Sequence, residues 1–567
     1  MRDFVDTVKA FAREEEAVGV VEIILILVVL ISLVIIFKDQ LTSLVESILS
    51  KITKQSNSIR SGEVPMEKKG SITVFLALIL SILLSLVSAS LQSVQAAATR
   101  TQILNGMDIG LYSLFGQYDR SLLRDYDLFF LDGTQGGTEL NLAAVYDNLE
   151  SYIKPVLKQN GRKLRIKQGG FTGYRLATDQ NGEVFYHQAV SYMKDTLGSQ
   201  GVQVLLKRMK EKEEKTKKAE EDGKSTENGE TLKNYDSEMN NAFNKSKEAE
   251  ENAKTEETKK DDGNNGADFE SGDAEDEFSD GESNDAKNPI PAIKKIRTMS
   301  ILDLVVPPAK GISDVQISTK DFVSKRNIQK GMSMPGEATE DSSQSSQLLF
   351  QKYLTDRLGN YQKPASSGLQ YQQEYILGAD DNDRSNLRIV ANRLIMIREG
   401  INAAYLMSDP AKRAQMHALA LGIASAFLVP PAAFIIEGAL LLCWAFAESV
   451  LDVRELFHGG KVPIVKSAAT WQVSLESIPH LLENLDSQRK TNENGMSYED
   501  YLQVLLMTKS KKEKLERGMD MIEVSIREKK GRDSFRLDCC IEAIEASVNV
   551  SSGRKKVFNV TRQYSYI

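Results

Sequence analysis

The most constraining feature of the chain is an apolar segment near its start that carries a single carboxylate. Residues 18–37 read VGVVEIILILVVLISLVIIF, and Glu22 is the only charged residue among them. As a helix, a segment of this length spans the ~30 Å hydrocarbon core of a bilayer. A charged side chain in hydrocarbon costs roughly 2.5 to 3.5 kcal/mol, so it is tolerated only where another group compensates it. We therefore expect a membrane helix whose Glu22 has a polar partner.

The sequence around this helix, EEEAVGVVEIILILVVLISLVIIFKDQLTSLVESILSKI, resembles the Flp-type (type IVb) pilins of tight-adherence (Tad) systems. The resemblance implies cleavage by a prepilin peptidase between Ala17 and Val18, and pairing of Glu22 with the α-amine of a neighbouring subunit. Two positions depart from the family pattern, because Ala17 stands where the family usually has Gly and Ile23 replaces the usual Tyr. The alternative is an ordinary transmembrane anchor with an isolated Glu, which the acidic flank before the segment disfavours.

A second apolar segment of membrane-spanning length, SITVFLALILSILLSLVSASL, covers residues 71–91. The residues after it keep the apolar spacing of an amphipathic helix as far as about residue 128. The pattern therefore predicts one membrane helix that continues into a long amphipathic helix.

The start of this second segment, KKGSITVFLAL, resembles the pseudopilins of Tad loci, with Gly70 and Ser71 at the processing point. The chain has Phe75 at the position that corresponds to the Glu of a pilin, so the resemblance implies a minor or non-polymerising component. The runs EYILGADDNDRSNLRIVANRLIMIREGIN and CWAFAESVLDVRELFHGGKVPIVKSAATWQ are similar to large extracytoplasmic proteins encoded beside Tad pili in Gram-positive anaerobes. This likeness covers residues 66–567 and implies no known activity.

Charge is concentrated in one internal stretch. The chain carries a net charge of −8, but residues 210–287 alone carry −13, with 26 acidic and 13 basic residues. Leu232 is the only branched aliphatic residue in that stretch, so little surface can be buried to offset the entropy of ordering. We therefore expect a disordered acidic linker. The predicted regions are a pilin segment over 1–60, a second membrane helix with the start of the ectodomain over 66–207, the linker over 208–288, and the rest of the ectodomain over 289–567.

The sequence shows no catalytic or metal-binding constellation. The three cysteines and four histidines have neither the number nor the spacing of a disulfide framework or a zinc site. Phosphate-loop, HExxH and GxSxG motifs are absent, and no basic stripe interleaved with aromatic residues appears in the ectodomain. We therefore expect no enzyme activity, no cofactor, no metal and no nucleic-acid partner.

Residues 418–450 are apolar enough for a third membrane span, but Pro430 and Pro431 divide them and Glu437 and Glu448 interrupt the second half. A helical hairpin in a soluble core is the favoured interpretation, and a membrane span is the alternative.

The acidic residues in the second half of this segment, and those just after it, lie near one face of the predicted helix. Glu448 and Asp452 are spaced by one helical turn, as are other acidic residues beside them. One hypothesis is an acidic groove or cation site. The favoured hypothesis is structural ion pairing of Glu448 and Asp452 with Arg393 and Arg398 of the preceding helix.

The expected fold class is α+β: two N-terminal membrane helices, the second continuing into a long amphipathic helix, with a mixed helical and antiparallel-sheet ectodomain and a disordered acidic insert. A strand is expected over 162–176, then a turn at Asn181-Gly182 and a strand that passes into a helix. Residues 301–318 are expected to be extended, 384–406 helical, and the last residues two antiparallel strands joined at Gly553.

Taken together, these features predict a structural or assembly component, minor pilin or pseudopilin-like, of a Tad-type type IVb pilus. The predicted partners are the membrane, other pilus subunits and a prepilin peptidase. Lysines and an arginine between the two apolar segments place the connecting loop in the cytoplasm by the positive-inside rule, so most of the chain is expected outside the cell membrane. The alternative is a membrane-anchored extracytoplasmic binding or scaffold protein.

Overall fold

The fold is α+β, as the sequence predicts. The computed structural model describes residues 70–158, 164–224, 288–332, 334, 340–426, 432–487, 489–553 and 556–566, together with 45–51 and isolated positions within 38–54 and 237–245. The first apolar segment, with Ala17, Val18 and Glu22, lies outside the described residues. The predicted disordered linker also lies outside them beyond residue 224, except for those positions, but its first residues, 208–224, are helical and form the end of α6 (Asp179–Lys224). The predicted region boundaries stay predictions.

The described chain divides into two compact units. Unit 1 contains the described residues up to Gln117 together with Ala143–Thr172 and Ile544–Tyr564, and unit 2 contains Tyr118–Leu142, Gly173–Ala543 and the described residues from Ser565. Unit 1 therefore joins the start of the chain to its C-terminal strands.

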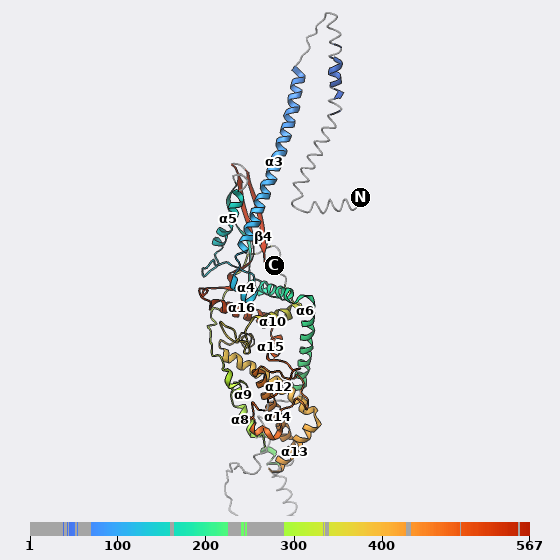
Figure 1. Ribbon diagram of the computed structural model, residues 1–567, viewed down its shortest axis with the longest axis vertical. Coiled ribbons are helices and arrows are strands. Elements are labelled where there is room, and N and C mark those ends of the chain that lie inside the picture. Colours follow the sequence, from blue (N-terminus) through green and yellow to red (C-terminus); the bar gives the residue numbers. More distant parts are fainter. Residues whose placement is uncertain are drawn as a thin grey trace, which may run out of the picture. The chain divides into compact units, whose positions relative to one another are not determined.

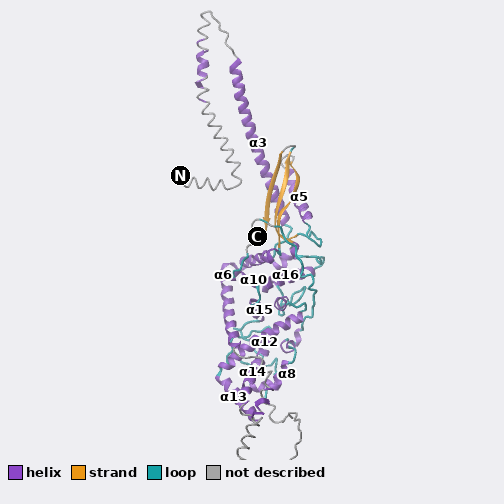
Figure 2. Cartoon of the chain, turned by 180° about the vertical axis from the view of Figure 1, so that it is seen from behind, coloured by secondary structure: helices purple, strands orange, loops and turns teal. Residues whose placement is uncertain are grey.

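Unit 1 is built on one long helix, α3, which runs without a break from Gly70 to Phe115 (Figure 1). This confirms that the second apolar segment continues into a long helix. The helix ends at Phe115 and not near residue 128 as predicted, because the chain turns at 116–117 and a separate short helix, α4 (Arg120–Tyr126), follows. A shorter helix, α5 (Leu142–Lys158), and most of strands β2 (Leu164–Leu176), β3 (Cys540–Ser552) and β4 (Lys556–Ser565) complete the unit (Figure 2). With the short strand β1 (Leu131–Asp132), the strand order is β1-β3-β2, and β4 also pairs with β3. The two C-terminal strands are thus confirmed, and Gly553 between them has the positive φ of a turn, 69°.

Unit 2 is mainly helical, with α14 (Ala433–His458) at its centre. This helix packs against α12 (Asp383–Ser408) and α13 (Pro410–Ala426), and 20 of its residues are buried. The other elements of unit 2 are α4 (Arg120–Tyr126), β1 (Leu131–Asp132), α6 (Asp179–Lys224), α8 (Ile290–Arg297), α9 (Ile301–Val305), η4 (Pro308–Lys310), α10 (Gln344–Arg357), α11 (Gln372–Gly378), η6 (Leu475–His480), α15 (Tyr498–Met507), α16 (Lys511–Arg527) and η7 (Leu537–Cys539).

Side-chain caps fix where several of these helices begin. The Asn382 side chain accepts a hydrogen bond from the Ser385 N–H and starts α12, as predicted for residues 384–406. Ser510 and Glu513 form a reciprocal capping box at the start of α16, so two backbone donors that a helix end leaves unpaired are satisfied.

Two local predictions are wrong. The turn at Asn181-Gly182 leads into helix α6 and not into a strand, because the apolar residues after it, Val184, Phe185 and Ala189, are buried at helical spacing. Residues 301–305 form the short helix α9 instead of extended chain, and their buried Leu302 and Val305 face the core one turn apart.

Two described helices are long and apolar enough to cross a membrane: Leu76–Phe115 of α3 and α14. They differ in their surroundings, because the most apolar window of α3 is fully uncovered whereas 72% of that of α14 is buried within the protein. Residues 418–450 accordingly contribute to the helical pair α13 and α14, of which α14 is a core helix. The three cysteines are free and buried.

Candidate functional site

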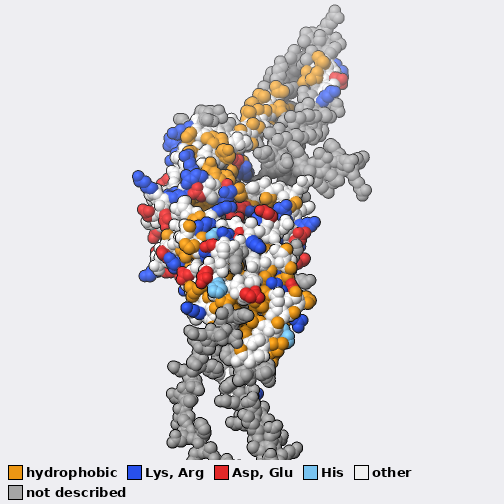
Figure 3. All heavy atoms as spheres, turned by 60° about the horizontal axis from the view of Figure 1, so that its bottom comes forward, with side chains coloured by type: hydrophobic (Ala, Val, Ile, Leu, Met, Phe, Trp, Pro, Cys, Tyr) orange, Lys and Arg blue, Asp and Glu red, His pale blue; other side chains and the backbone are white. Residues whose placement is uncertain are grey.

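The first functional surface is the N-terminal half of α3, whose apolar side chains face outward. Leu76 is 63% exposed, Leu84 60% and Leu91 57%, and the exposed apolar side chains continue to Val94. Figure 3 shows hydrophobic side chains along this part of the helix. An apolar face of this size on an isolated helix is unfavourable in water but is the surface that a bilayer solvates.

The C-terminal half of the same helix is part of a packed core. Ile103, Met107 and Leu111 recur at a spacing of four residues and are at most 1% exposed. The neighbouring Gly106 and Gly110 face α5, in which Ile153 and Leu149 are fully buried. A single helix therefore changes from a lipid-type surface to a protein core along its length.

Two glycines let α3 and α5 approach closely. A Cβ added at Gly110 would lie 2.5 Å from Cγ1 of Ile153, whereas one added at Gly106 would meet Leu157 at 3.5 Å. Small residues four positions apart form a groove on a helix that admits the neighbouring helix. Gly110 is thus required by the packing, and Gly106 lies in ordinary contact.

Strand β4 is attached to the same helix from another side. Nε of Arg562 lies 3.2 Å from a carboxylate oxygen of Asp108, and the rings of Tyr564 and Phe115 are 4.8 Å apart. The end of the chain is therefore anchored on the helix that starts near its beginning. Unit 1 consists of a long N-terminal helix with a small sheet and a second helix packed on its distal half.

The second candidate site is a buried cluster of charges on α14. Glu448 and Asp452 are both 0% exposed. Nζ of Lys466 donates to Glu448 at 2.5 Å and to Asp452 at 2.7 Å, and the guanidinium of Arg398 donates to Asp452 at 2.8 Å. Asn402 adds a hydrogen bond of 3.1 Å to the same carboxylate. Two acids and two bases thus balance within the core.

The structure brings together some of the predicted partners and not others. Asp452 and Arg398 are in contact, while Glu448 lies with Lys466, a residue that the sequence pattern did not single out. Arg393, five residues before Arg398, is half-buried outside this cluster. The carboxylates are enclosed, so they do not line the open acidic groove considered from the sequence.

The pKa values of Asp452 and Glu448 are shifted in opposite directions. Burial alone raises the pKa of a carboxyl group, but Arg398 and Lys466 bring the pKa of Asp452 below its ordinary value. For Glu448, burial outweighs Lys466, and its pKa is raised. Asp452 is thus the charged centre of the cluster, held by both cations.

The described residues offer no arrangement for metal chemistry. Nowhere in the ranges that the structure describes do three or more His, Cys, Asp or Glu side chains converge as metal ligands. The cysteine thiols are held protonated, because burial raises the pKa of Cys443 to about 12 and that of Cys539 to about 11.

Comparison with known proteins finds two family matches. Residues 10–58 match the family described as "Putative Flagellin, Flp1-like, domain", and residues 279–552 match a family of unknown function (DUF5702). No curated protein and no solved structure is similar to the chain at a significant level. The first match covers the apolar segment that contains Glu22, and the second covers most of unit 2 and part of the C-terminal sheet.

The family matches and the apolar helices support the same interpretation. A pilin-type domain next to apolar helices indicates a pilus-related structural component that is anchored in a membrane and interacts with other pilus subunits. Neither matched family is described by an enzymatic activity.

Proposed function

We propose that the chain is a minor pilin or pseudopilin-like component of a Tad-type type IVb pilus, with residues 92–567 outside the cell. The observation that carries the proposal is the form of unit 1: one unbroken helix, α3, with an exposed apolar first half and a second half that packs under a small sheet. The Flp1-like match over residues 10–58, which contain the first apolar segment, supports the same assignment.

The two halves of α3 have separate roles in this proposal. The exposed apolar half is held in the bilayer before assembly, because its burial there removes the hydrophobic surface from water. The packed half carries α5 and the small sheet on the outer side of the membrane. Gly110 lets α5 pack closely on the helix, and the contact between the rings of Tyr564 and Phe115 holds β4 against it.

Glu22 gives the proposal its test. Within an apolar helix this carboxylate needs a partner, and the proposal supplies the α-amine of a neighbouring subunit after cleavage between Ala17 and Val18. Glu22→Gln should therefore leave membrane insertion intact and abolish incorporation into filaments. Glu14→Gln is the matched control, because it removes an acid from the flank outside the apolar segment.

The measurement is pilus yield after shearing, with carbonate extraction of membranes to verify insertion and mass spectrometry of the mature N-terminus. Wild-type yield from Glu22→Gln would overturn the role of the first segment as a pilin. An intact N-terminus with no release at Val18 would favour a membrane-anchored scaffold protein that uses the helices only as anchors.

A further inference from the structure

Unit 1 carries a cluster of basic side chains beside the exposed apolar half of α3. The cluster comes from three segments that are far apart in the sequence: the end of α5, the start of β2 and the start of β4. Its members are exposed, and among the described residues they pair with no carboxylate: Lys158, Arg165, Lys167 and Lys556. We call these four residues the basic end of unit 1.

The packing of α5 on α3 places Lys158 in this cluster. The glycine contacts described above show that α5 runs antiparallel to α3. Near the end of α5, the Val156 carbonyl accepts a hydrogen bond of 3.3 Å from the Gln102 side chain. Lys158 therefore lies close to the level of Gln102, and α3 rises by only about 12 Å between that level and Val94, where its exposed apolar side chains end.

Strand β4 places Lys556 at the same end. Later residues of β4 contact later residues of α3, since Nε of Arg562 lies 3.2 Å from a carboxylate oxygen of Asp108 and the ring of Tyr564 lies against that of Phe115. The start of β4 therefore points toward the apolar half of the helix (Figure 1). The six residues back to Lys556 rise by about 20 Å along a strand, as do fourteen residues of helix. Lys556 is thus level with the end of the exposed apolar side chains.

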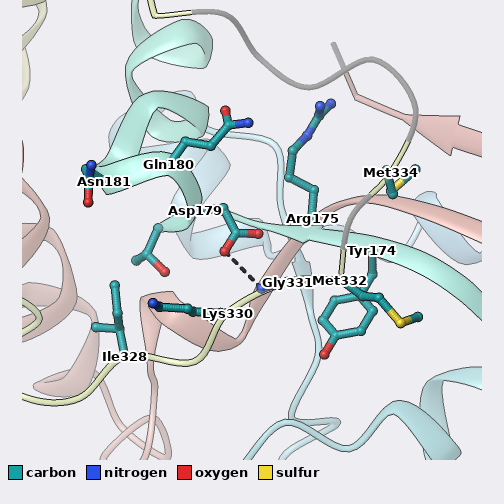
Figure 4. A pocket seen from close by; sticks show the side chains of 11 residues that line it. Tyr174, Arg175, Asp179, Gln180, Asn181, Ile328, Lys330, Gly331, Met332 and Met334 are labelled. Atoms are coloured by element: carbon teal, nitrogen blue, oxygen red, sulfur yellow. Dashed lines mark hydrogen bonds between the residues drawn. The ribbon is translucent and has the colours of Figure 1, made fainter.

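The first residues of β2 complete the cluster. The Ser551 hydroxyl, near the end of β3, donates a hydrogen bond of 3.3 Å to the Arg165 carbonyl, so Arg165 and Lys167 lie beside the turn between β3 and β4. The other end of β2 is held in unit 2, where Figure 4 shows Tyr174 next to Met332, and their backbones exchange hydrogen bonds of 2.9 and 3.2 Å. The exposed basic residues of β2 thus lie at its start.

The sequence places no acid among these basic residues. Residues 85–107, 151–172 and 546–564 contain neither Asp nor Glu. On the two helices, the acids just outside these ranges are Asp108 and Glu150, and they pair with Arg562 and Lys154. The basic residues gather only in the fold, so the positive-inside rule, which counts basic residues next to a span in the sequence, does not include them.

We propose that the basic end of unit 1 binds the phosphate head groups of anionic phospholipids. In a bilayer that solvates the apolar half of α3, the head groups occupy about 5 to 8 Å beyond the hydrocarbon, which reaches the level of Lys556. Each basic side chain near an anionic leaflet strengthens the attraction roughly fivefold, within a Debye length of about 8 Å. Val557, which is 63% exposed, adds an apolar side chain at the same level.

The anchoring of α3 favours a lipid over a soluble phosphate as the ligand. It holds head groups beside the basic end at an effective concentration that a free anion does not reach. Binding fixes the tilt and rotation of unit 1 over the membrane, which a single helix leaves free. The inference requires only that α3 is anchored in a bilayer, so it is independent of the pilus assignment and of the side of the membrane.

The first test reconstitutes the full chain in nanodiscs that contain equal amounts of phosphatidylglycerol and phosphatidylcholine. After extraction into a mild detergent, mass spectrometry counts the phospholipids that remain bound. Phosphatidylglycerol should be enriched, and the triple variant Lys158→Gln, Arg165→Gln, Lys556→Gln should lower its ratio to phosphatidylcholine by roughly fivefold or more. The control variant removes three exposed lysines of unit 2: Lys207→Gln, Lys320→Gln and Lys530→Gln. No enrichment in the wild type, or equal losses in the two triple variants, would overturn the proposal.

The second test locates the basic end relative to the head groups. A bimane fluorophore on Val557→Cys should be quenched by a head-group spin-labelled lipid more strongly in nanodiscs with phosphatidylglycerol than in pure phosphatidylcholine, and high salt should remove the difference. Gln563→Cys is the control, because it is exposed on the same strand about 20 Å further from the apolar half of α3 and should be quenched little in both lipids. Equal quenching at position 557 in the two lipids would contradict the proposal.

Two further measurements distinguish the ways in which the inference can fail. Soluble glycerol 3-phosphate should not displace the retained phosphatidylglycerol, and displacement would replace the lipid with a free phosphate ligand. Release of the chain from membranes by carbonate would overturn the anchoring by α3 and the inference with it. Lipid enrichment together with a normal pilus yield from Glu22→Gln would overturn the pilin role of the first segment alone.

Discussion

At the scale of single residues, Asp452 is the most sensitive position of unit 2. It is fully buried and holds both Arg398 and Lys466, so its removal leaves two buried cations with Glu448 alone. Breaking a buried pair by removing one partner costs about 3 to 5 kcal/mol. We therefore expect Asp452→Asn to lower the free energy of unfolding by about that amount, measured by chemical denaturation of the full chain in detergent.

The double variant tests whether the loss comes from the pair. In Asp452→Asn with Arg398→Met, one stranded cation is gone, so the double variant should lose less than the sum of the two single losses. Strictly additive losses would show that Asp452 and Arg398 are not energetically coupled.

Glu374 makes the stability of unit 2 depend on pH. It is 0% exposed, and burial raises its pKa to about 7 from the ordinary 4.5, against hydrogen bonds from the Tyr498 hydroxyl and the Tyr361 N–H. A carboxyl group with a raised pKa stabilises the fold below its ordinary value and loses that contribution as pH rises through 7. Stability should therefore fall between pH 4.5 and pH 7 by an amount on the order of 3 kcal/mol.

Glu374→Gln removes this titration and keeps an oxygen that can accept both hydrogen bonds. The variant should show a flatter profile of unfolding free energy between pH 5 and 8, and it should exceed the wild type most at the alkaline end. A smaller slope should remain, because burial also raises the pKa of Asp520, to about 6. An unchanged profile in the variant would assign the slope to other groups.

The residue scale also shows how far the sequence could predict the sites. Glu448 and Asp452 share a helical face by their spacing, and Arg398 lies on a strongly periodic helix, so their encounter could be anticipated. Lys466 could not, because it comes from irregular chain after α14 whose path depends on tertiary packing.

At the scale of elements, α3 provides a matched pair of glycines. Both gain helix propensity when changed to alanine, so their difference reports the packing on α5. Because the new Cβ would overlap Ile153 only at position 110, Gly110→Ala should be less stable than Gly106→Ala by roughly 1 to 3 kcal/mol. Thermal unfolding of the full chain in detergent, followed by circular dichroism, measures this difference. Equal stability of the two variants would mean that α5 can move away from α3 at little cost.

Elements with a strong period were predictable, and those that depend on one unusual residue were not. The continuation of the second apolar segment into α3, the helix around residues 384–406 and the two C-terminal strands follow from apolar spacing that repeats over many residues. The sequence around Asn181-Gly182 reads as a hairpin turn because Asn and Gly favour positive φ. Those φ values are present, but the apolar residues after the turn follow a helical period, and the tertiary core selects the helix.

At the scale of the whole molecule, the two apolar segments conflict in orientation. A pilin helix and a pseudopilin helix each have the N-terminus in the cytoplasm, and two such helices in series cannot both keep that orientation in one bilayer. Lys51, Lys54, Arg60, Lys68 and Lys69 lie between the segments, whereas acidic residues offset the basic residues before the first segment. The positive-inside rule therefore favours the proposed orientation of α3, and the first apolar segment would be inverted relative to a pilin unless the two halves exist as separate chains.

Single introduced cysteines can decide between these orientations. The three native thiols are buried, so a membrane-impermeant maleimide applied to intact cells should report mainly on new positions. Ser318→Cys, at an exposed position of unit 2, should be labelled without permeabilisation, because residues 92–567 are expected outside. Ser56→Cys, between the apolar segments, should be labelled only after the cells are permeabilised. Labelling of Ser56→Cys in intact cells with none at Ser318→Cys would reverse the orientation of α3, and the pseudopilin assignment of the larger part of the chain would fail with it.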